Sequence, residues 1–280
     1  MKSAVLITIP LLLWGTILFA AEKYGDAILE EGAMTILREG ETLNFDTAGE
    51  SIEVFEQDLL RLRAKSRVIL NSREKATLAL GSNAVFQVKP WEQKGESGFL
   101  RALFGRFRAA VTDLVGGEEF NVKTATATIG IKGTEYIATI TSQGNAMLVV
   151  TENSVAFQGL VGPPQLVGEN LVSVVVGANP ATPPAPVPPA VLEALSGDNL
   201  DSPPPNAPGA ADLPGEEGLI NAGIVSEKQL EQGKEDEPDF DVEEDDEGDI
   251  GVETPDIDDI DLEEAKENLF RGDVRIDFQQ

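Results

Sequence analysis

Ten short runs of β-branched or alternating apolar residues follow one another between Gly32 and Gly177. They are separated by Gly, Asn, Ser or charged pairs, and they read AMTIL, SRVIL, ATLAL, AVFQV, FNV, TIGI, YIATIT, AMLVVT, SVAFQ and LVSVVV. Short runs of this kind, without a long helical period, predict an all-β domain. We place this domain at residues 22–178, a length sufficient to bury a core of its own.

Two stretches are the best candidates for helices inside this domain. Residues 51–64 place Ile52, Phe55, Leu59 and Leu60 near one face of a helix. Residues 98–111 are the second candidate, but Gly105 and the alternation of Phe and Arg also allow an edge strand there.

Residues 1–21 have the layout of a secretory signal peptide, because Lys2 precedes an apolar run that ends in small residues. We expect cleavage after Ala20 or Ala21. The run from Ala4 to Ala21 is only slightly shorter than the roughly 20 residues of a single-pass helix, so an uncleaved membrane anchor is the alternative. In both cases we expect residues 22–280 to be exported, to the periplasm or to the cell surface and extracellular space.

The character of the sequence changes after the domain. Residues 179–215 are rich in Pro and predict an extended linker. Residues 191–280 contain 29 Asp/Glu and 5 Lys/Arg, so they carry a net charge of −24 out of the −28 of the whole chain. We interpret residues 216–280 as an acidic, largely disordered tail, in which residues 261–271 have the capping signals of one short helix.

The chain contains no His and no Cys. Thiolate nucleophiles, His-centred triads, most zinc sites and disulfides are therefore excluded. The negative net charge also argues against nucleic acid as a partner, since phosphate binding needs a basic surface. We predict no catalytic residue, no metal site and no cofactor, and hence no enzyme.

Three remaining motifs do not change this prediction. Glu118 and Glu119 could serve a glycan-acting hydrolase, but neighbouring strand residues point to opposite faces. Residues 243–254 resemble an EF-hand loop in part, yet Glu243 and Thr254 stand where the first Asp and the bidentate Glu belong. Residues 271–273 spell the adhesion tripeptide RGD without a predicted loop to present it.

The segment TATATIGIKGTEYIATI, residues 124–140, predicts a strand, a turn and a second strand. Thr and Ile alternate with small residues, so one face can press closely against a neighbouring layer. Gly130 and Gly133 are expected where a side chain would block that approach or where a positive φ is needed. This explanation concerns folding and requires no ligand.

The longer run FNVKTATATIGIKGTEYIATI resembles the signature of the FecR domain. Ile131, Lys132 and Tyr136 are conservative departures from the usual Val, Arg and Phe, and Ala125 replaces the usual Pro. The resemblance extends over roughly residues 32–178. The matching positions are Phe120, Val122, Thr124, Thr126, Ala127, Gly130, Gly133, Thr134 and Glu135.

The resemblance implies a single extracytoplasmic sensing or interaction domain of solenoid-like or sandwich form, without enzymatic activity. Full-length members add a cytoplasmic anti-sigma segment and a transmembrane helix, and they relay the state of a siderophore receptor to a sigma factor. Here only residues 1–3 precede the apolar run. We therefore expect a free-standing exported domain that binds an envelope protein or an anionic polymer, and membrane contact only if the N-terminal segment is uncleaved. The alternative is a membrane-anchored signalling component related to the iron-siderophore regulators.

Two sets of residues are candidates for partner binding. The first is the signature turn, with Thr126, Gly130, Lys132, Gly133, Thr134 and Glu135, although a turn of this kind more often serves packing and solvation. The second is a basic face within residues 61–108, for which we name Arg61, Arg63, Arg67, Arg101, Arg106 and Arg108. Such a face could bind an anionic polymer or the protein's own acidic tail. The alternative is a solvated surface whose charges are balanced by residues 22–60.

Overall fold

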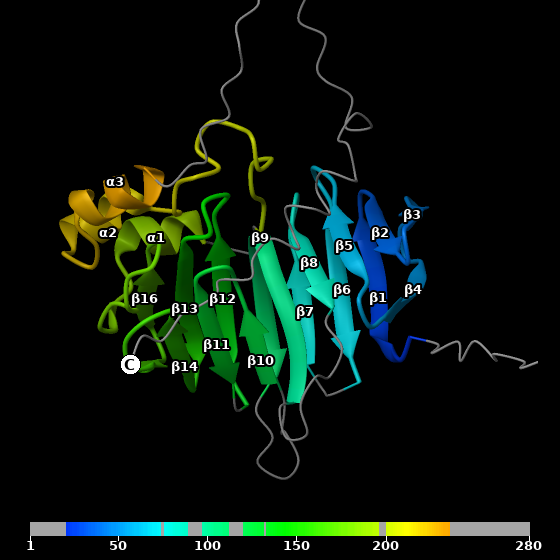
Figure 1. Cartoon of the computed structure of the whole chain (residues 1–280), viewed down its shortest axis with the longest axis horizontal. Helices are drawn as coiled ribbons and strands as arrows, with labels where there is room; N and C mark the ends of the chain where they lie inside the picture. The colour runs from blue at the N-terminus through cyan, green and yellow to red at the C-terminus, as the bar shows by residue number, and fades with distance from the viewer. Residues whose placement is uncertain are drawn as a thin grey trace, which may run out of the picture. The chain divides into compact units, whose positions relative to one another are not determined.

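The computed structural model describes residues 21–73, 76–88, 97–111, 120–131, 133–195 and 200–235. These residues form two β-sheets, called sheet A and sheet B here, which share the long strand β9 (Ser97–Val111). Figure 1 shows β9 in the middle of the arrangement and short helices at the end where β16 lies. The all-β prediction is confirmed.

Sheet A has the strand order β4–β1–β6–β7–β9–β12–β13–β16–β17, and all of its neighbouring strands are antiparallel. Its strands besides β9 are β1 (Lys23–Glu31), β4 (Ser51–Phe55), β6 (Arg67–Ser72), β7 (Ala76–Leu80), β12 (Glu135–Ile140), β13 (Ala146–Glu152), β16 (Leu171–Val175) and β17 (Ala185–Pro186).

Sheet B has the order β3–β2–β5–β8–β9–β10–β11–β14–β15, with one parallel pair, β9 and β10. Its strands besides β9 are β2 (Met34–Arg38), β3 (Glu41–Phe45), β5 (Leu59–Leu62), β8 (Val85–Val88), β10 (Phe120–Lys123), β11 (Ala127–Ile131), β14 (Ser154–Gly159) and β15 (Gln165–Gly168).

Strand β9 belongs to both layers because it changes sheet at Gly105. Residues up to Phe104 pair with β8 and β10 in sheet B, and residues from Gly105 onward pair with β7 and β12 in sheet A. Gly105 has φ +105°, and a Cβ there would lie 2.7 Å from the Cα of Ala84. Glycine is required at this bend on both counts. The helix expected at residues 98–111 is therefore wrong, and the strand is central rather than at an edge.

The two sheets pack face to face over one hydrophobic core. Phe86 from sheet B meets Phe107 from sheet A edge to face, with ring centroids 5.0 Å apart, and Tyr136 extends this stack at 5.9 Å. All three side chains are fully buried, and burial of each large apolar side chain contributes roughly 1.5–3 kcal/mol. The sandwich form that the resemblance implied is what these contacts build.

The helix expected at residues 51–64 is replaced by strands β4 and β5. Ile52 and Val54 point into the core with exposed residues between them, and Leu60 and Leu62 repeat this alternation. Gln57 has φ +70° in the turn between the strands, which ends any helical path. The period of two therefore outweighs the weak helical pattern.

Residues 179–195 and 200–235 differ from the expected linker and tail, because they fold over the outer face of sheet A. They contain β17 and the helices α1 (Pro189–Ala194), α2 (Glu216–Asn221) and α3 (Glu227–Glu235). Their buried side chains form a second hydrophobic cluster with the outward-facing residues of β12, β13 and β16. From the sheet come Ile137, Met147, Val149, Val172 and Val174, directly after β16 comes Val176, and from the C-terminal segment come Val191, Leu195, Leu200, Leu213, Leu219, Ile224, Val225 and Leu230.

Proline is compatible with this structure for simple reasons. Pro189 stands at the first position of α1, where the missing N–H has no helical partner in any case. Pro186 lies on the edge strand β17, where one ladder bond can be omitted. We call residues 179–195 and 200–235 the C-terminal cover, and this cover shields an apolar sheet face that would otherwise meet water.

Candidate functional site

The signature segment crosses from one sheet to the other and does not form a hairpin. Strand β11 pairs with β10 and β14 in sheet B, whereas β12 pairs with β9 and β13 in sheet A. Gly133, in the connection between β11 and β12, has φ +68°. The sequence-based explanation, a glycine that permits a positive φ where two layers meet, matches this geometry.

The threonines that precede β11 are used to fix the chain path. The Oγ1 of Thr124 accepts hydrogen bonds from the backbone N–H of Ala127 at 2.8 Å and of Thr126 at 3.2 Å. The hydroxyl of Thr126 donates to the carbonyl oxygen of Gly144 at 2.6 Å. Both threonines are buried. Thr126, a predicted binding residue, is thus turned into the fold.

Gly130 lies on the outward side of β11, in register with Asn121 on β10 and Ala156 on β14. A Cβ at Gly130 would lie 3.2 Å from the Oδ1 of Asn121 and 3.7 Å from the Cβ of Ala156. The outer face of sheet B therefore has no large side chain here, since Gly130 lies beside the methyl group of Ala156.

The rest of the predicted turn is held by contacts within the domain. Asn153 donates from Nδ2 to the carbonyl oxygen of Gly133 at 2.9 Å. Glu135 lies 3.8 Å from the Nε of Arg108 across the β9–β12 pair. The hydroxyl of Thr134 is buried and has no hydrogen-bond partner among the described residues. Lys132 lies outside the described residues, and so do Glu118–Glu119, residues 243–254 and the whole segment 261–273.

The six arginines of the predicted basic face do not share one face. In β5, in β6 and on both sides of the bend in β9, the neighbouring apolar residues point into the core, so the arginines on these strands point outward from their own sheet. Arg61 and Arg101 belong to strands of sheet B, and Arg63 follows β5. Arg67, Arg106 and Arg108 belong to sheet A, whose outer face is the opposite side of the sandwich.

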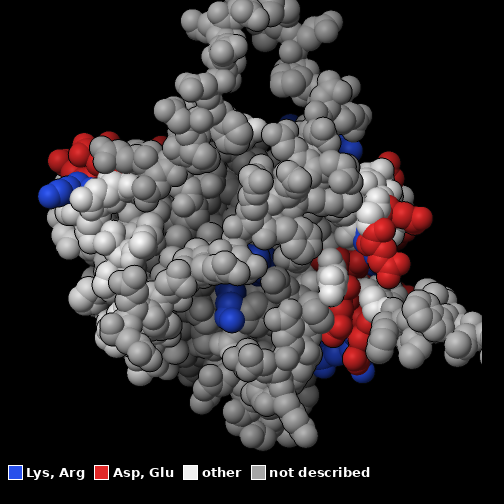
Figure 2. Space-filling view, viewed as in Figure 1, with Lys and Arg blue, Asp and Glu red and all other residues white. Residues whose placement is uncertain are grey.

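Some of these charges are already used within the molecule. Arg67 pairs with Glu30 at 3.0 Å, and the nearby Arg73 pairs with Glu22 at 2.8 Å. Figure 2 shows acidic side chains gathered at the end of the sandwich where β1 to β4 lie, with basic side chains among them. This pattern fits the alternative of a surface balanced by residues 22–60.

A small cavity of about 230 Å³ lies between the β-domain and the C-terminal cover. It is lined by Glu31, Lys65, Ser66, Arg67, Gly81, Leu200 and Asp201. The cover is fastened beside it, because Asp201 accepts a hydrogen bond from the hydroxyl of Ser82, and Asn83 donates to the carbonyl oxygen of Ser202 at 2.5 Å. Its charges are of both signs, so it selects no ligand by charge.

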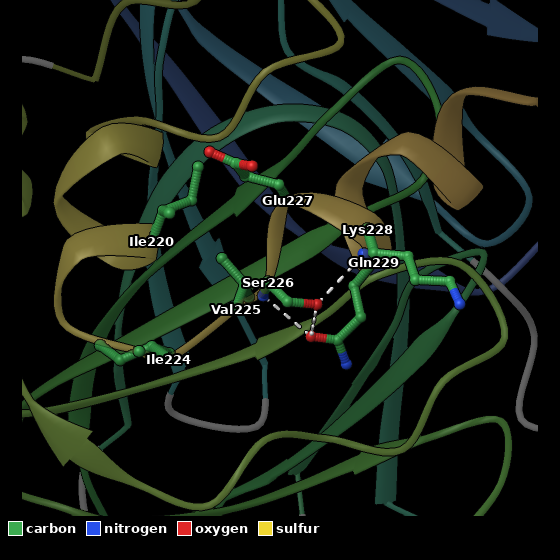
Figure 3. A pocket seen from close by; sticks show the side chains of 8 residues that line it. Ile220, Ile224, Val225, Ser226, Glu227, Lys228 and Gln229 are labelled. Atoms are coloured by element: carbon green, nitrogen blue, oxygen red, sulfur yellow. Dashed lines mark hydrogen bonds between the residues drawn. The ribbon is translucent and has the colours of Figure 1, made fainter.

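An open hollow of about 540 Å³ lies at the start of α3 (Figure 3). Ser226 and Gln229 form a reciprocal capping box there: the N–H and hydroxyl of Ser226 each lie 3.0 Å from the Oε1 of Gln229, and the N–H of Gln229 donates to the Ser226 hydroxyl at 3.3 Å. These polar groups satisfy one another, so the hollow offers little to a ligand.

The described ranges contain no cluster of metal-ligating side chains. Among these residues no group of three or more Asp, Glu, His or Cys is placed to hold a metal ion. None of the helices that the structure describes is both long and apolar enough to cross a bilayer. The apolar run 4–21 lies outside the described residues.

Sequence reasoning missed one exposed apolar group, which we call the β15 patch: Leu160, Val161 and Leu166. Their exposed fractions are 63%, 51% and 70%. They stand in the sequence GLVGPPQLVG, whose Gly and Pro residues mark a loop rather than a strand. Large apolar residues in a segment whose Gly and Pro residues predict a surface loop could have indicated this patch.

The chain was compared with solved structures, with curated proteins and with models of protein families. Two crystal structures of a candidate anti-sigma factor from Parabacteroides distasonis ATCC 8503, at 1.65 Å and 2.50 Å resolution, are similar to this chain with a TM-score of 0.38 and 13% identity. The similarity covers 44% of this chain and 56% of each of theirs, so this chain spans just over half of their length. No curated protein matches the chain.

The model of the FecR protein family matches residues 58–156, from β5 to β14 and including the sheet-crossing signature. The part of the chain from β5 to β14 is therefore similar to the FecR domain, as its sequence signature indicated.

Proposed function

We propose that this protein is an exported, non-catalytic sensing and binding module of the bacterial cell envelope, which acts through contact with a partner protein. The FecR match supports a role in sensing or signalling. The observation that carries the proposal is the crossing from β11 to β12, where the family signature serves to join two layers of a sandwich. Thr124, Thr126 and Glu135 of this segment bond within the fold, so we infer that the domain offers surfaces for contact rather than a chemical centre.

A protein partner fits the charges better than an anionic polymer does. A polymer such as a polyanionic glycan would need several basic side chains on one surface. The candidate arginines are divided between the outer faces of the two sheets, and Arg67 is paired with Glu30. The β-sandwich also exposes apolar side chains at the β15 patch, which suit a protein surface.

Export rests on the layout of residues 1–21, and two forms of the product follow from it. A cleaved signal peptide gives a free domain, and a retained apolar run gives an anchored one. Both place the FecR domain on the far side of the inner membrane. The anchored form would make the protein a membrane-bound signalling component.

The test is to identify the product and its neighbours in the native bacterium. N-terminal sequencing of the purified product should give a start at or directly after Ala21, and fractionation should place it outside the cytosol. Photo-reactive residues introduced at exposed positions of sheet B, such as Gln158, should cross-link to a specific envelope protein that mass spectrometry identifies. A cytosolic product, or cross-links that are as diffuse as those of an unrelated exported domain, would contradict the proposal.

A further inference from the structure

Four of the strands that the structure describes lie at a sheet edge, and three of these are protected against pairing with another chain. Charged side chains and proline are the usual protection of an exposed edge. Edge β4 carries the exposed Glu53, edge β3 carries the exposed Glu41 with polar neighbours, and edge β17 contains Pro186. The fourth edge, β15, carries none of these within the strand.

Strand β15 pairs with β14 on one side, and none of the strands that the structure describes pairs with its other side. Val167 points into the core and is fully buried, so Leu166 points outward, where 70% of it is exposed. Leu160 and Val161, in the connection from β14, bring two further apolar side chains to the same end of the sheet. Backbone groups without a partner strand thus lie next to a group of exposed apolar side chains, which is the combination that marks an interaction edge.

The neighbouring surface leaves room for side chains of an added strand. Leu166 is in register with Ala156 on β14, which is in register with Gly130 on β11. The row from the edge inward is therefore a leucine, a methyl group and a glycine. A side chain of an added strand that reaches past Leu166 can pack against Ala156 and Gly130, where the sheet surface has no large side chain.

The charge of the chain segment from β12 to the start of α3 restricts what can bind. Residues 133–227 contain ten Asp or Glu and no Lys or Arg. A second copy of the chain would bring the same acidic end to the contact, and the C-terminal residues 236–280 are more acidic still. Both occupants would be repelled, whereas a segment with basic residues would be attracted.

We propose that the free edge of β15, together with the β15 patch, binds an extended segment of a partner protein as an additional strand, and that Lys or Arg residues flank the apolar residues of that segment. Main-chain hydrogen bonds to β15 give this contact its affinity, and the apolar side chains against Leu160, Val161 and Leu166 give it selectivity. The inference rests on the proposed binding function and names the surface and the partner chemistry for it.

The experiment uses the chain from residue 22 to residue 280 and three synthetic peptides. The first peptide alternates Val and Thr and has two Lys at each end, the second has Glu in place of Lys, and the third has Pro in place of its central Val. Fluorescence anisotropy at low ionic strength measures binding, and hydrogen exchange of the amides of residues 165–168 locates it. We expect the Lys peptide to slow exchange in β15, the Glu peptide to bind at least about tenfold more weakly, and the Pro peptide to lose binding because it cannot donate to the ladder.

Two variants connect the result to the edge. Leu166→Lys places a positive charge in the β15 patch and should weaken binding of the Lys peptide at least about tenfold. Thr42→Lys makes the same kind of change on the exposed side of edge β3 and should leave binding unchanged. Circular dichroism and thermal unfolding confirm that both variants keep the fold.

Several results would overturn the proposal. These are no binding of the Lys peptide at millimolar concentration, protection that maps away from β15, or equal effects of the two variants. Amides of β15 that are already as protected as those of β14 in the free chain would show that the edge is occupied by another segment or copy. Cross-links in cells that reach a partner through other surfaces would overturn this inference and leave the proposed binding function standing.

Discussion

The guanidinium of Arg106 on β9 donates a 3.0 Å hydrogen bond from Nη1 to the carbonyl oxygen of Ala194 at the end of α1. Arg106 is 7% exposed, and burial lowers the pKa of its guanidinium, an effect that the charge of Asp201 partly opposes. A buried cation needs such partners, because leaving it without them is costly. Both Ala194 and Asp201 belong to the C-terminal cover, which is therefore part of the folded domain.

The first prediction tests this cover with two neighbouring residues of α1. Val191 is fully buried in the second hydrophobic cluster, whereas Leu192 is 53% exposed. Val191→Asp should lower the free energy of unfolding by about 2 kcal/mol or more and open residues 179–235 to protease, because a charge would be buried against sheet A. Leu192→Asp should stay within about 0.5 kcal/mol of the parent. Urea unfolding and limited proteolysis read both effects, and equal behaviour of the two variants would show that the cover does not pack as described.

The fold class could be predicted from sequence because inward positions recur with a period of two. Each of the ten runs named from sequence corresponds to a strand. The C-terminal cover was missed because its signal is distributed: β13 and β16 are apolar on both faces, which indicates cover on both sides. The matching apolar residues of the cover are spread singly through a Pro-rich and acidic sequence, where composition alone favours an open chain.

The candidate site could be predicted only in part, because local sequence does not show which sheet a strand joins. The positive φ of Gly133 follows from its place in a turn, and the sequence shows that place. Whether Arg61 and Arg67 share a face depends on which sheet each strand joins. Here β5 and β6 are consecutive in the chain but belong to different layers. Local sequence does not contain that assignment.

The second prediction concerns Arg38 and Asp58. Asp58 is fully buried and accepts hydrogen bonds from the Nε of Arg38 at 2.8 Å, from its Nη2 at 2.7 Å and from the N–H of Phe55 at 2.8 Å. The guanidinium also lies 4.4 Å above the centre of the Phe55 ring. Arg38→Ala should lower the free energy of unfolding by about 3 kcal/mol, because it leaves a buried carboxylate without its cation.

Arg61→Ala is the matched control, since Arg61 is exposed on the neighbouring strand β5. It should change the free energy of unfolding by less than about 0.5 kcal/mol. Guanidinium chloride unfolding measures both variants. A cost for Arg38→Ala as small as that of the control would mean that the Arg38–Asp58 pair does not support the fold.

The third prediction separates two glycines that both have positive φ. Gly105→Ala combines a strained backbone with a Cβ placed 2.7 Å from the Cα of Ala84, so it should cost at least about 2 kcal/mol. Gly133→Ala has open space around the added Cβ, so only the backbone conformation opposes it, at about 1 kcal/mol. Thermal unfolding gives the order, and a larger loss at Gly133 than at Gly105 would contradict the role assigned to the bend in β9.

The last prediction follows from Tyr136, where the FecR signature usually has Phe. Its side chain is fully buried, and its hydroxyl has no hydrogen-bond partner among the described residues. Burial raises the pKa of this phenol well above its ordinary value of 10.0. Above about pH 10 the unfolded chain releases this proton and the folded chain keeps it, so the free energy of unfolding falls as pH rises. Below that pH the contribution is fully present.

Tyr136→Phe keeps the ring contact with Phe107 and removes the hydroxyl. At pH 7 it should raise the free energy of unfolding by about 1 kcal/mol, because a buried polar group without a partner is lost. Between pH 9 and pH 11, on either side of the ordinary phenol pKa, the variant should lose less stability than the parent chain. Urea unfolding at both pH values checks this, with Tyr24→Phe as the control for the other tyrosine. If Tyr136→Phe destabilises the chain at pH 7 and leaves the alkaline slope unchanged, the hydroxyl of Tyr136 has a partner in the folded protein.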